Sequence, residues 1–203
     1  MLMERNLYFA VTPAEKIGLG KEIKIMPSNK LVFLGADICL ANFRGEERRS
    51  KRTGEVVNAA GDRNFCIKLT PEKARELKLE GWNIKPYFSA GNTDRVVPDF
   101  EYLPVAIRFE PYPPKVFMVS GHKKTDLGED TIGLLQGREF ENIDLVISGS
   151  RWERGGRTGI KAYLFKGGFT LLLDEFDQKY DYLEDDGNLP PFEMEDGDQA
   201  SNW

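Results

Sequence analysis

Arginine and lysine side chains gather in the segment between residues 44 and 63, where they could bind phosphate groups. Three glycines give this segment flexibility, and four acidic residues oppose its cations. Flexible guanidinium groups suit a phosphate backbone, because each contact releases condensed counterions without demanding one fixed geometry. A solvated loop carrying charges of both signs is the alternative. The candidate phosphate-binding residues are Arg44, Arg48, Arg49, Lys51, Arg52 and Arg63.

Aromatic side chains lie beside cations elsewhere in the chain, and each ring could stack on a planar ligand. Side chains at alternate positions of a strand share a face. Lys161, Tyr163 and Phe165 are therefore predicted to line one face, while Ala162, Leu164 and Lys166 line the other. A ring that stacks on a nucleobase contributes about 1–3 kcal/mol, and the alternative for each ring is a place in the core. The further candidates are Phe65, Trp82, Lys85, Arg151, Trp152, Arg154, Arg157, Lys161 and Tyr163.

Charge is distributed unevenly along the chain. The last thirty residues, 174–203, hold eleven acidic side chains against one lysine and therefore carry a net charge of −10. The whole chain carries −5, which leaves +5 for residues 1–173. A basic body with an acidic tail predicts a domain that binds polyanions and a tail that competes for that surface or recruits a partner. Phe192 and Trp203 are the predicted partner-binding anchors of a largely disordered tail.

The body has the residue pattern of short strands joined by glycine-rich turns. Gly35 interrupts a long apolar run and predicts a bend or bulge there. Gly155 and Gly156 predict a hairpin turn with positive φ angles. Strands are predicted over residues 31–43, 63–69, 102–109, 115–119, 143–152 and 159–173.

Two short helices accompany these strands. Thr70 and Pro71 predict the start of a helix, and Gly81 stands where it should end. A second helix is predicted over residues 129–140, although Gly133 and Gly137 weaken it. Residues 120–125 are predicted to form a loop.

Five or six strands with one or two short helices are typical of an oligonucleotide-binding (OB-fold-like) barrel. This mainly β fold is a five-stranded Greek-key barrel with a helix between its third and fourth strands, and its loops and one barrel face hold the ligand. The arginine-rich segment falls between the first two strands, where the barrel has a principal binding loop. A generic β-sandwich is the alternative. We predict an unassigned extension over residues 1–22, the barrel over residues 23–173 and the tail over residues 174–203.

Three segments carry a resemblance to a known family. Residues 61–67, 81–85 and 158–164 resemble those of bacteriophage single-stranded DNA-binding proteins with an oligonucleotide-binding barrel, and the acidic, aromatic-ended tail is similar to tails of that functional class. The resemblance covers about residues 23–203. It implies a protein without cofactor or catalysis that coats single-stranded DNA in replication, recombination or repair. Its tail would contact a polymerase, primase or helicase.

Other function classes lack the residues that they need. The single histidine, His122, leaves no two-histidine metal site, and neither a phosphate-binding loop nor a nucleophile elbow is present. A carboxylate-only nuclease and an interaction protein without DNA affinity stay as alternatives. Cys39 and Cys66 are expected to be buried free thiols. No apolar run approaches the roughly 20 residues of a membrane span, so a cytoplasmic protein is expected, with a homo-oligomer left open.

Overall fold

The structure, a computed structural model, describes residues 23–26, 30–50, 53–92 and 95–173. The extension 1–22 and the tail 174–203, with Phe192 and Trp203, lie outside these residues. Lys51 and Arg52 also lie outside them. The predictions made for these parts of the chain therefore stay predictions.

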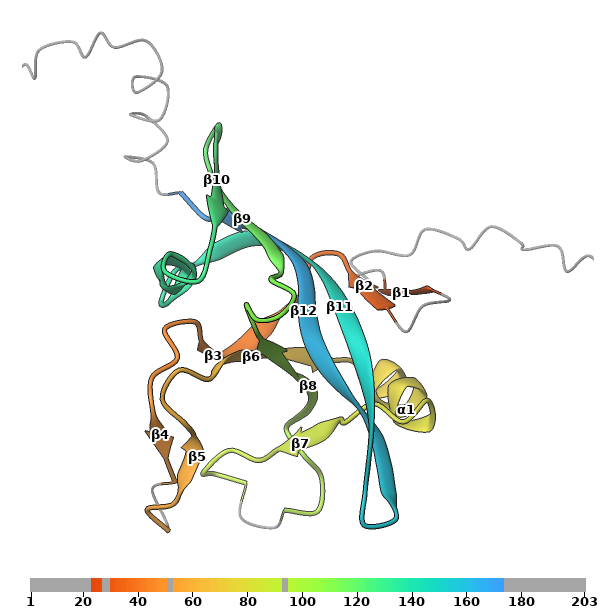
Figure 1. Cartoon of the computed structure of the whole chain (residues 1–203). Coiled ribbons are helices and arrows are strands. Elements are labelled where there is room, and N and C mark those ends of the chain that lie inside the picture. The colour runs from red at the N-terminus through yellow and green to blue at the C-terminus, as the bar shows by residue number, and fades with distance from the viewer. Residues whose placement is uncertain (1–22, 27–29, 51–52, 93–94, 174–203) are drawn as a thin grey trace, which may run out of the picture.

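The described residues form a mainly β structure with one α-helix, as predicted in outline (Figure 1). Ten strands belong to one sheet, and β4 and β5 pair separately as a two-stranded hairpin. The strands before the helix are β1 (Ile23–Met26), β2 (Lys30–Phe33), β3 (Ile38–Asn42), β4 (Arg48–Arg49), β5 (Val56–Asn58) and β6 (Arg63–Leu69). Those after it are β7 (Lys85–Tyr87), β8 (Phe100–Ile107), β9 (Lys115–Ser120), β10 (Lys123–Leu127), β11 (Phe140–Arg154) and β12 (Arg157–Leu171).

The main sheet runs in the order β1-β2-β11-β12-β8-β6-β3, with β12 near its centre. β11 and β12 form the long predicted hairpin, and its turn glycines have φ angles of 58° at Gly155 and 73° at Gly156. β12 then runs parallel to β8 through residues 162–163 and parallel to β9 through residues 166–170. This one strand therefore joins the two halves of the sheet.

The first predicted strand, residues 31–43, is one bent path divided into β2 and β3. Gly35 lies at the bend with a φ of 63°, a conformation in which glycine has no steric penalty. On one side of the bend, the Ala36 amide donates to the Ile143 carbonyl of β11 at 2.7 Å. On the other side, the Lys68 amide donates to the Asp37 carbonyl at 2.9 Å. The path therefore hydrogen-bonds to β11 on one side of the bend and to β6 on the other, but the strand ladders do not close into a barrel.

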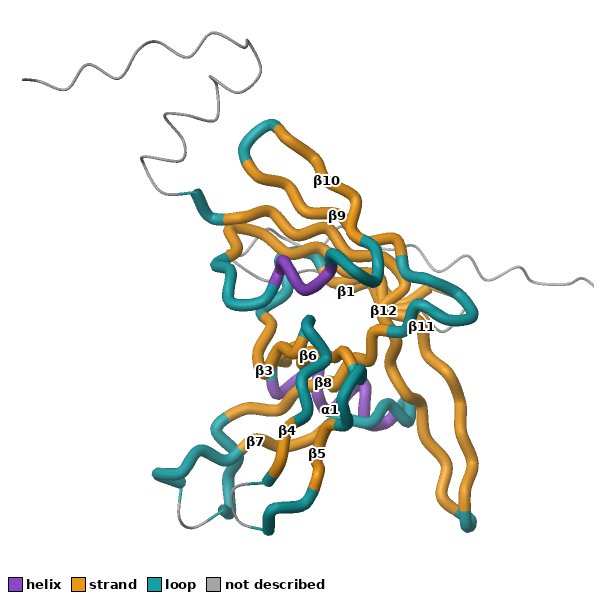
Figure 2. Tube along the Cα trace, turned by 60° about the vertical axis from the view of Figure 1, so that its left-hand side comes forward, coloured by secondary structure: helices purple, strands orange, loops and turns teal. Residues whose placement is uncertain are grey.

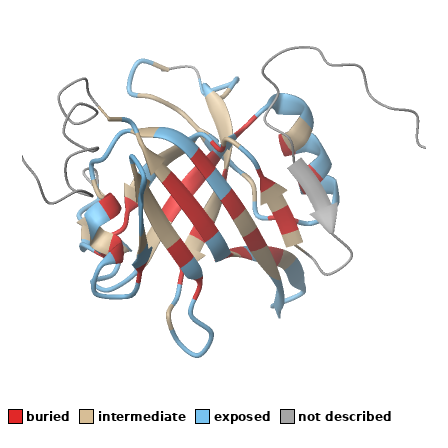
Figure 3. Cartoon of the chain, turned by 90° about the horizontal axis from the view of Figure 1, so that it is seen from above, coloured by how far each residue is buried: buried red, intermediate tan, exposed pale blue. Residues whose placement is uncertain are grey.

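The core residues lie on one face of the sheet and follow the alternation of the strands (Figure 3). Phe43, Phe65 and Phe169 are its largest fully buried side chains. The ring centroid of Phe43 lies 5.9 Å from that of Phe65 and 5.7 Å from that of Phe169. The stripe of buried residues leaves the opposite face of β8 and β12 for other contacts.

The α-helix α1 (Pro71–Leu79) forms where predicted, directly after β6. The Thr70 hydroxyl accepts a hydrogen bond from the Lys73 amide, and Gly81 follows with a φ of 91°. Ala74 and Leu77 are buried, and the other face is solvent-exposed. α1 follows β6, the second long strand, as the sequence predicted, whereas a typical oligonucleotide-binding barrel has its helix between the third and fourth strands. Neither it nor any other described helix is long and apolar enough to cross a membrane.

Two local predictions are wrong. The helix expected over residues 129–140 is only a 3-10 turn, η1 (Ile132–Leu135), because Gly137 takes a φ of 76° and the chain enters β11. The loop expected over residues 120–125 is only a two-residue turn at 121–122, because residues 123–125 belong to β10 and pair with β9 in a hairpin, with Lys124 opposite Val119. Figure 2 shows this hairpin at the opposite end of the molecule from β4, β5 and the tip of β11–β12.

Candidate nucleic-acid interface

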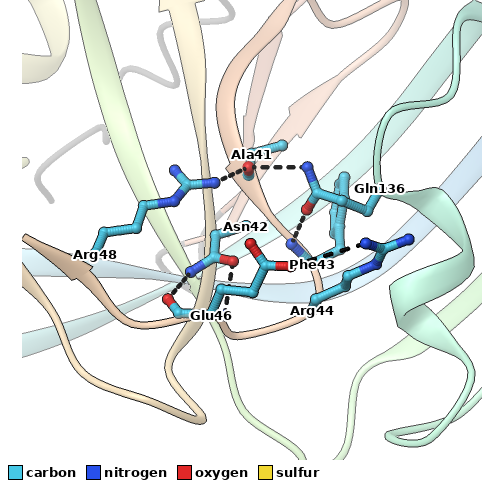
Figure 4. Close-up of polar contacts among 7 residues, drawn as sticks. All are labelled: Ala41, Asn42, Phe43, Arg44, Glu46, Arg48 and Gln136. Carbon is cyan, nitrogen blue, oxygen red and sulfur yellow. Dashed lines mark hydrogen bonds and ion pairs between the residues drawn. The ribbon is translucent and has the colours of Figure 1, made fainter.

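The arginine-rich segment is a hairpin whose base is fixed by Asn42. This side chain is fully buried, and its amide donates to the Glu46 carbonyl at 2.8 Å and accepts from the Glu46 amide at 2.9 Å (Figure 4). A longer bond of 3.4 Å reaches the Asp62 carbonyl at the other end of the hairpin. Asn58 donates to the same two carbonyls, at 3.1 Å and 2.9 Å. The two ends of the hairpin are therefore held together by side-chain amides.

Gln136 and Arg48 attach the hairpin to the sheet. The Gln136 side chain, next to η1, accepts from the Phe43 amide at 2.8 Å and donates to the Ala41 carbonyl at 3.3 Å (Figure 4). The guanidinium of Arg48 donates to the carbonyls of Ala41 at 2.5 Å and Leu40 at 3.1 Å. Arg48 is half-buried, so much of its donor capacity serves the fold.

The other described arginines of this segment are paired with acids. Arg49 contacts Glu47 at 2.7 Å, and Arg44 lies 3.8 Å from Glu46. The side chain of Arg63, only 20% exposed, contacts Glu129 at 2.8 Å. These pairs lower the net positive charge that the hairpin presents to a ligand.

A groove of about 720 Å³ crosses the exposed face of β6 and β8. The β4–β5 hairpin supplies one wall through Arg48, Val57 and Asn58. Trp152 and Lys161, from β11 and β12, supply the other wall. Figure 1 shows the β4–β5 hairpin and the tip of β11–β12 at the same end of the molecule, with β7 and β8 between them. The groove therefore lies between two hairpins that come from distant parts of the chain.

Cations and aromatic rings line this groove. Five cationic residues face one acidic residue, Asp62, so the lining favours an anion. Tyr102 and Trp152 add rings that are not fully buried. The cations of the lining are Arg48, Arg63, Lys85, Arg108 and Lys161.

Trp152 is the most exposed ring of the groove, at 41% of its surface. It lies opposite Gly159 across the hairpin, and a Cβ built on Gly159 would come within 2.9 Å of the indole. The absence of a side chain at this position therefore lets the indole lie close to the backbone. Arg151, Arg154 and Arg157 are also exposed near the tip of this hairpin.

The predicted alternation along β12 is correct from Lys161 to Phe165. Ala162 and Leu164 are buried, whereas Lys161 and Phe165 are exposed and Tyr163 is half-buried. The ammonium of Lys161 lies 5.4 Å from the Tyr163 ring centroid, and the guanidinium of Arg108 lies 5.5 Å from it. Lys166 was expected on the same face as Ala162 and Leu164 but is exposed, because the strand register shifts at this point.

Phe65 and Trp82 do not belong to the exposed stacking surface. Phe65 has no exposed surface, and Trp82 is 5% exposed. The indole of Trp82 donates to the Glu80 carboxylate at 3.2 Å, and the next residue, Asn83, donates its amide to Ile160 at 3.1 Å. Both rings are core residues, which corrects the prediction that they stack on bases.

Tyr102 and Arg108 are groove residues that the sequence analysis missed. Tyr102 lies in β8 and Arg108 directly follows it, and both alternate with the buried residues Leu103, Val105 and Ile107. The apolar alternation over residues 102–109 could have identified them, because residues between the buried positions of a strand point to the opposite face.

The two cysteines are free and lie opposite each other on β3 and β6. Cys66 is buried, as expected, and lines the groove floor, whereas Cys39 is only half-buried. Burial raises the pKa of the Cys66 thiol to about 12 and also raises the pKa of Cys39. Both thiols are therefore neutral near pH 7. Within the described residues, no group of three or more histidine, cysteine or carboxylate side chains could hold a metal ion.

A groove lined by cations and rings between two hairpins defines a candidate site for an extended polyanion, and the sequence comparison agrees with this class. Residues 21–203 match the family described as "Putative phage ssDNA-binding domain". The chain belongs to this phage single-stranded DNA-binding family, as the resemblance had indicated. A search of curated proteins finds no match.

Solved structures of the single-stranded DNA-binding protein from bacteriophage Enc34 are similar to this chain. The C-terminally truncated form matches with 13% identity and a TM-score of 0.44, covering 83% of this chain and 99% of that one. The form in complex with single-stranded DNA has the same identity and TM-score, covering 81% and 97%.

Proposed function

We propose that this protein binds and coats single-stranded DNA with little sequence preference. The observation that carries the proposal is the groove over β6 and β8, with five cations, one acid and two accessible rings. Single strands without sequence preference are bound by this combination, because cations follow the backbone and every base has a face that can stack. Membership of the phage single-stranded DNA-binding family supports the same conclusion.

The rings and the cations of the groove have different parts in binding. Trp152 and Tyr102 stack on bases, while Lys85, Arg108 and Lys161 neutralise phosphates. The arginines of the β4–β5 hairpin that pair with acids contact the DNA backbone only where a phosphate replaces the carboxylate. Binding of this kind weakens as the salt concentration rises.

We also propose that the sheet is a variant of the oligonucleotide-binding barrel. The bent path of β2 and β3 corresponds to its first strand, and β6, β8, β11 and β12 correspond to the other four. The parallel pairing of β8 with β12 and the backbone hydrogen bonds on both sides of the bend support this proposal. Bending of one strand then takes the place of a closing ladder.

The protein acts, in this proposal, on phage DNA during replication, recombination or repair, without catalysis, in the host cytoplasm. Its acidic tail, residues 174–203, competes with DNA for the groove or recruits replication proteins. The net charge of −10 on those thirty residues supports both roles, since the groove lining is cationic.

The first test is a fluorescence-anisotropy titration of labelled poly-dT against duplex DNA of the same length at two salt concentrations. Tight, salt-sensitive binding that prefers the single strand is the expected result. Absence of binding to either DNA would overturn the proposal. Magnesium-dependent loss of the full-length oligonucleotide would identify a nuclease instead.

Deletion of residues 174–203 tests the proposed role of the tail. Removing ten net negative charges should strengthen DNA binding. The gain should be largest at low salt, because salt screens the attraction between the tail and the groove. The control is a full-length chain in which the acidic residues of the tail are replaced by Asn and Gln. Weaker DNA binding after deletion would contradict the proposal that the tail competes with DNA.

A further inference from the structure

The exposed face of β12 continues beyond the groove. Lys161 lines the groove, and Tyr163 and Phe165 follow it on the same face. A register shift then leaves Phe165 as an extra residue, because Ile147 lies opposite Leu164 while Val146 lies opposite Lys166. Such a bulge changes the direction of a side chain, and here both Phe165 and Lys166 are exposed.

Small side chains surround the middle of this face. Tyr163 lies between Ala106 of β8 and Ser148 of β11, and Lys30 of β2 lies opposite Ser148. The ring of Tyr163 is therefore larger than the side chains beside it on β8 and β11. A planar ligand that follows β12 meets no bulky side chain before Phe165.

Cations of this face lie against rings and not against carboxylates. The ammonium of Lys30 lies 3.8 Å from the Phe165 ring centroid, and that of Lys166 lies 5.9 Å from it. Arg108 and Lys161 lie over Tyr163 in the same way. Among the described residues, none of these four cations forms an ion pair with an acid. Their charge therefore remains available to an anionic ligand.

We propose that single-stranded nucleic acid leaving the groove at Lys161 continues along this face, which then forms a second part of the binding site. The inference rests on the proposed function and extends it. Phe165 stacks on a base, and Lys30 and Lys166 neutralise the phosphates beside it. We call this surface the β12 track, formed by Lys30, Arg108, Lys161, Tyr163, Phe165 and Lys166.

The length of the β12 track sets how much nucleic acid it holds. Lys161 and Phe165 are four residue steps apart along the strand, a distance of about 13 Å at ~3.3 Å per step. This equals about four stacked base steps of ~3.4 Å. A second copy of this chain fits the face less well, because two such surfaces would bring unpaired cations together.

The experiment compares oligo-dT strands of about 4 to about 16 nucleotides, the range bound by single oligonucleotide-binding barrels. The two test variants are Phe165→Ala and the double variant Lys30→Gln/Lys166→Gln. Both should equal the unchanged protein on the shortest strands that fill the groove. On longer strands they should bind about fivefold or more weakly, and the occluded site should shorten by about four nucleotides.

The matched control is Arg75→Gln/Leu79→Ala, which removes an exposed cation and an exposed apolar side chain from α1. It should change binding at no strand length, and all variants should keep the thermal midpoint of the unchanged protein. Equal loss at every length would overturn the track, because Phe165 would then belong to the groove itself.

A different result is that the two test variants bind as tightly as the unchanged protein at every length while Trp152→Ala weakens binding at every length. This result would reject the β12 track and leave the proposed function intact. Failure of the unchanged protein to bind any strand would reject the proposed function itself. If the two test variants change only the sedimentation of the protein, the face mediates self-association and the track is wrong.

Discussion

The β4–β5 hairpin and the exposed face of β12 are both rich in cations, but the cations have different neighbours. In the hairpin, Arg49 pairs with Glu47 and Arg48 donates to backbone carbonyls. On β12, Lys161 lies over the ring of Tyr163 and has no acid partner among the described residues. The number of cations in a segment therefore does not give the charge that it offers to a ligand. The nearest acceptor of each cation decides that charge.

The largest effect on affinity is expected for Trp152→Ala. Loss of one stacking ring should weaken binding of single-stranded DNA by about 1–3 kcal/mol, which is roughly five- to 150-fold. The slope of log affinity against log salt should stay the same, because no phosphate contact is lost. Anisotropy titrations at several salt concentrations measure both quantities. A reduced slope would show that Trp152 does not act by stacking.

The largest effect on stability is expected for Asn42→Ala. The substitution leaves the Glu46 amide without its buried acceptor, which should lower the free energy of unfolding by about 1–3 kcal/mol. Urea denaturation measures this change. Asn142→Ala is the control, because Asn142 is exposed and its side chain donates to the exposed Asp144, so its effect should stay within about 0.5 kcal/mol. Equal losses of unfolding free energy in the two variants would contradict a structural role for the buried Asn42 amide.

Lys161→Gln and Arg49→Gln compare the two regions directly. Lys161→Gln should reduce the salt slope by about 0.7, the value for one phosphate contact on a single strand. Arg49→Gln should reduce it by less, because its charge already has a carboxylate partner. The two slopes come from the same titration series. A larger reduction for Arg49 would reverse the assignment of the two surfaces.

The smallest effect concerns the Cys66 thiol in the groove floor. Its pKa is raised by burial from 9.0 to about 12, so the unfolded chain loses this proton at a lower pH than the folded chain. The free energy of unfolding should therefore fall as the pH rises above 9. Urea denaturation at about pH 8 and about pH 10 tests this, with Cys66→Ala as the control that should fall less steeply. The same fall in both proteins would contradict the assignment.

Regular elements were the most predictable part of the fold. β6 and α1 lie where the apolar alternation and the Thr70 cap predicted them, since these signals are local. β9 was predicted, but β10 was missed because Lys123, Lys124 and Asp126 are polar and give the segment no apolar alternation, although its pairing with β9 is local. The helix over residues 129–140 failed because a positive φ at Gly137 ends it.

The candidate site was predictable in composition but not in detail. Trp152, Lys85 and Lys161 were predicted from their residue types and lie together in the groove. Phe65 and Trp82 were predicted wrongly, because sequence proximity to cations does not distinguish a core ring from an exposed one. The β-bulge at Phe165 could not be predicted, because the register of β11 and β12 depends on the whole sheet.

The central position of β12 has a consequence for how the chain folds. The strand is the last one described, yet it holds β11, β8 and β9 together. A nascent chain that ends before Arg157 has the strands of both halves of the sheet but lacks the strand that joins them. Long-range pairing of this kind is slow to form, because loop closure must precede the contacts that compensate for it. Folding should therefore be completed only after synthesis passes Leu171, and a ribosome stalled earlier should carry a protease-sensitive chain.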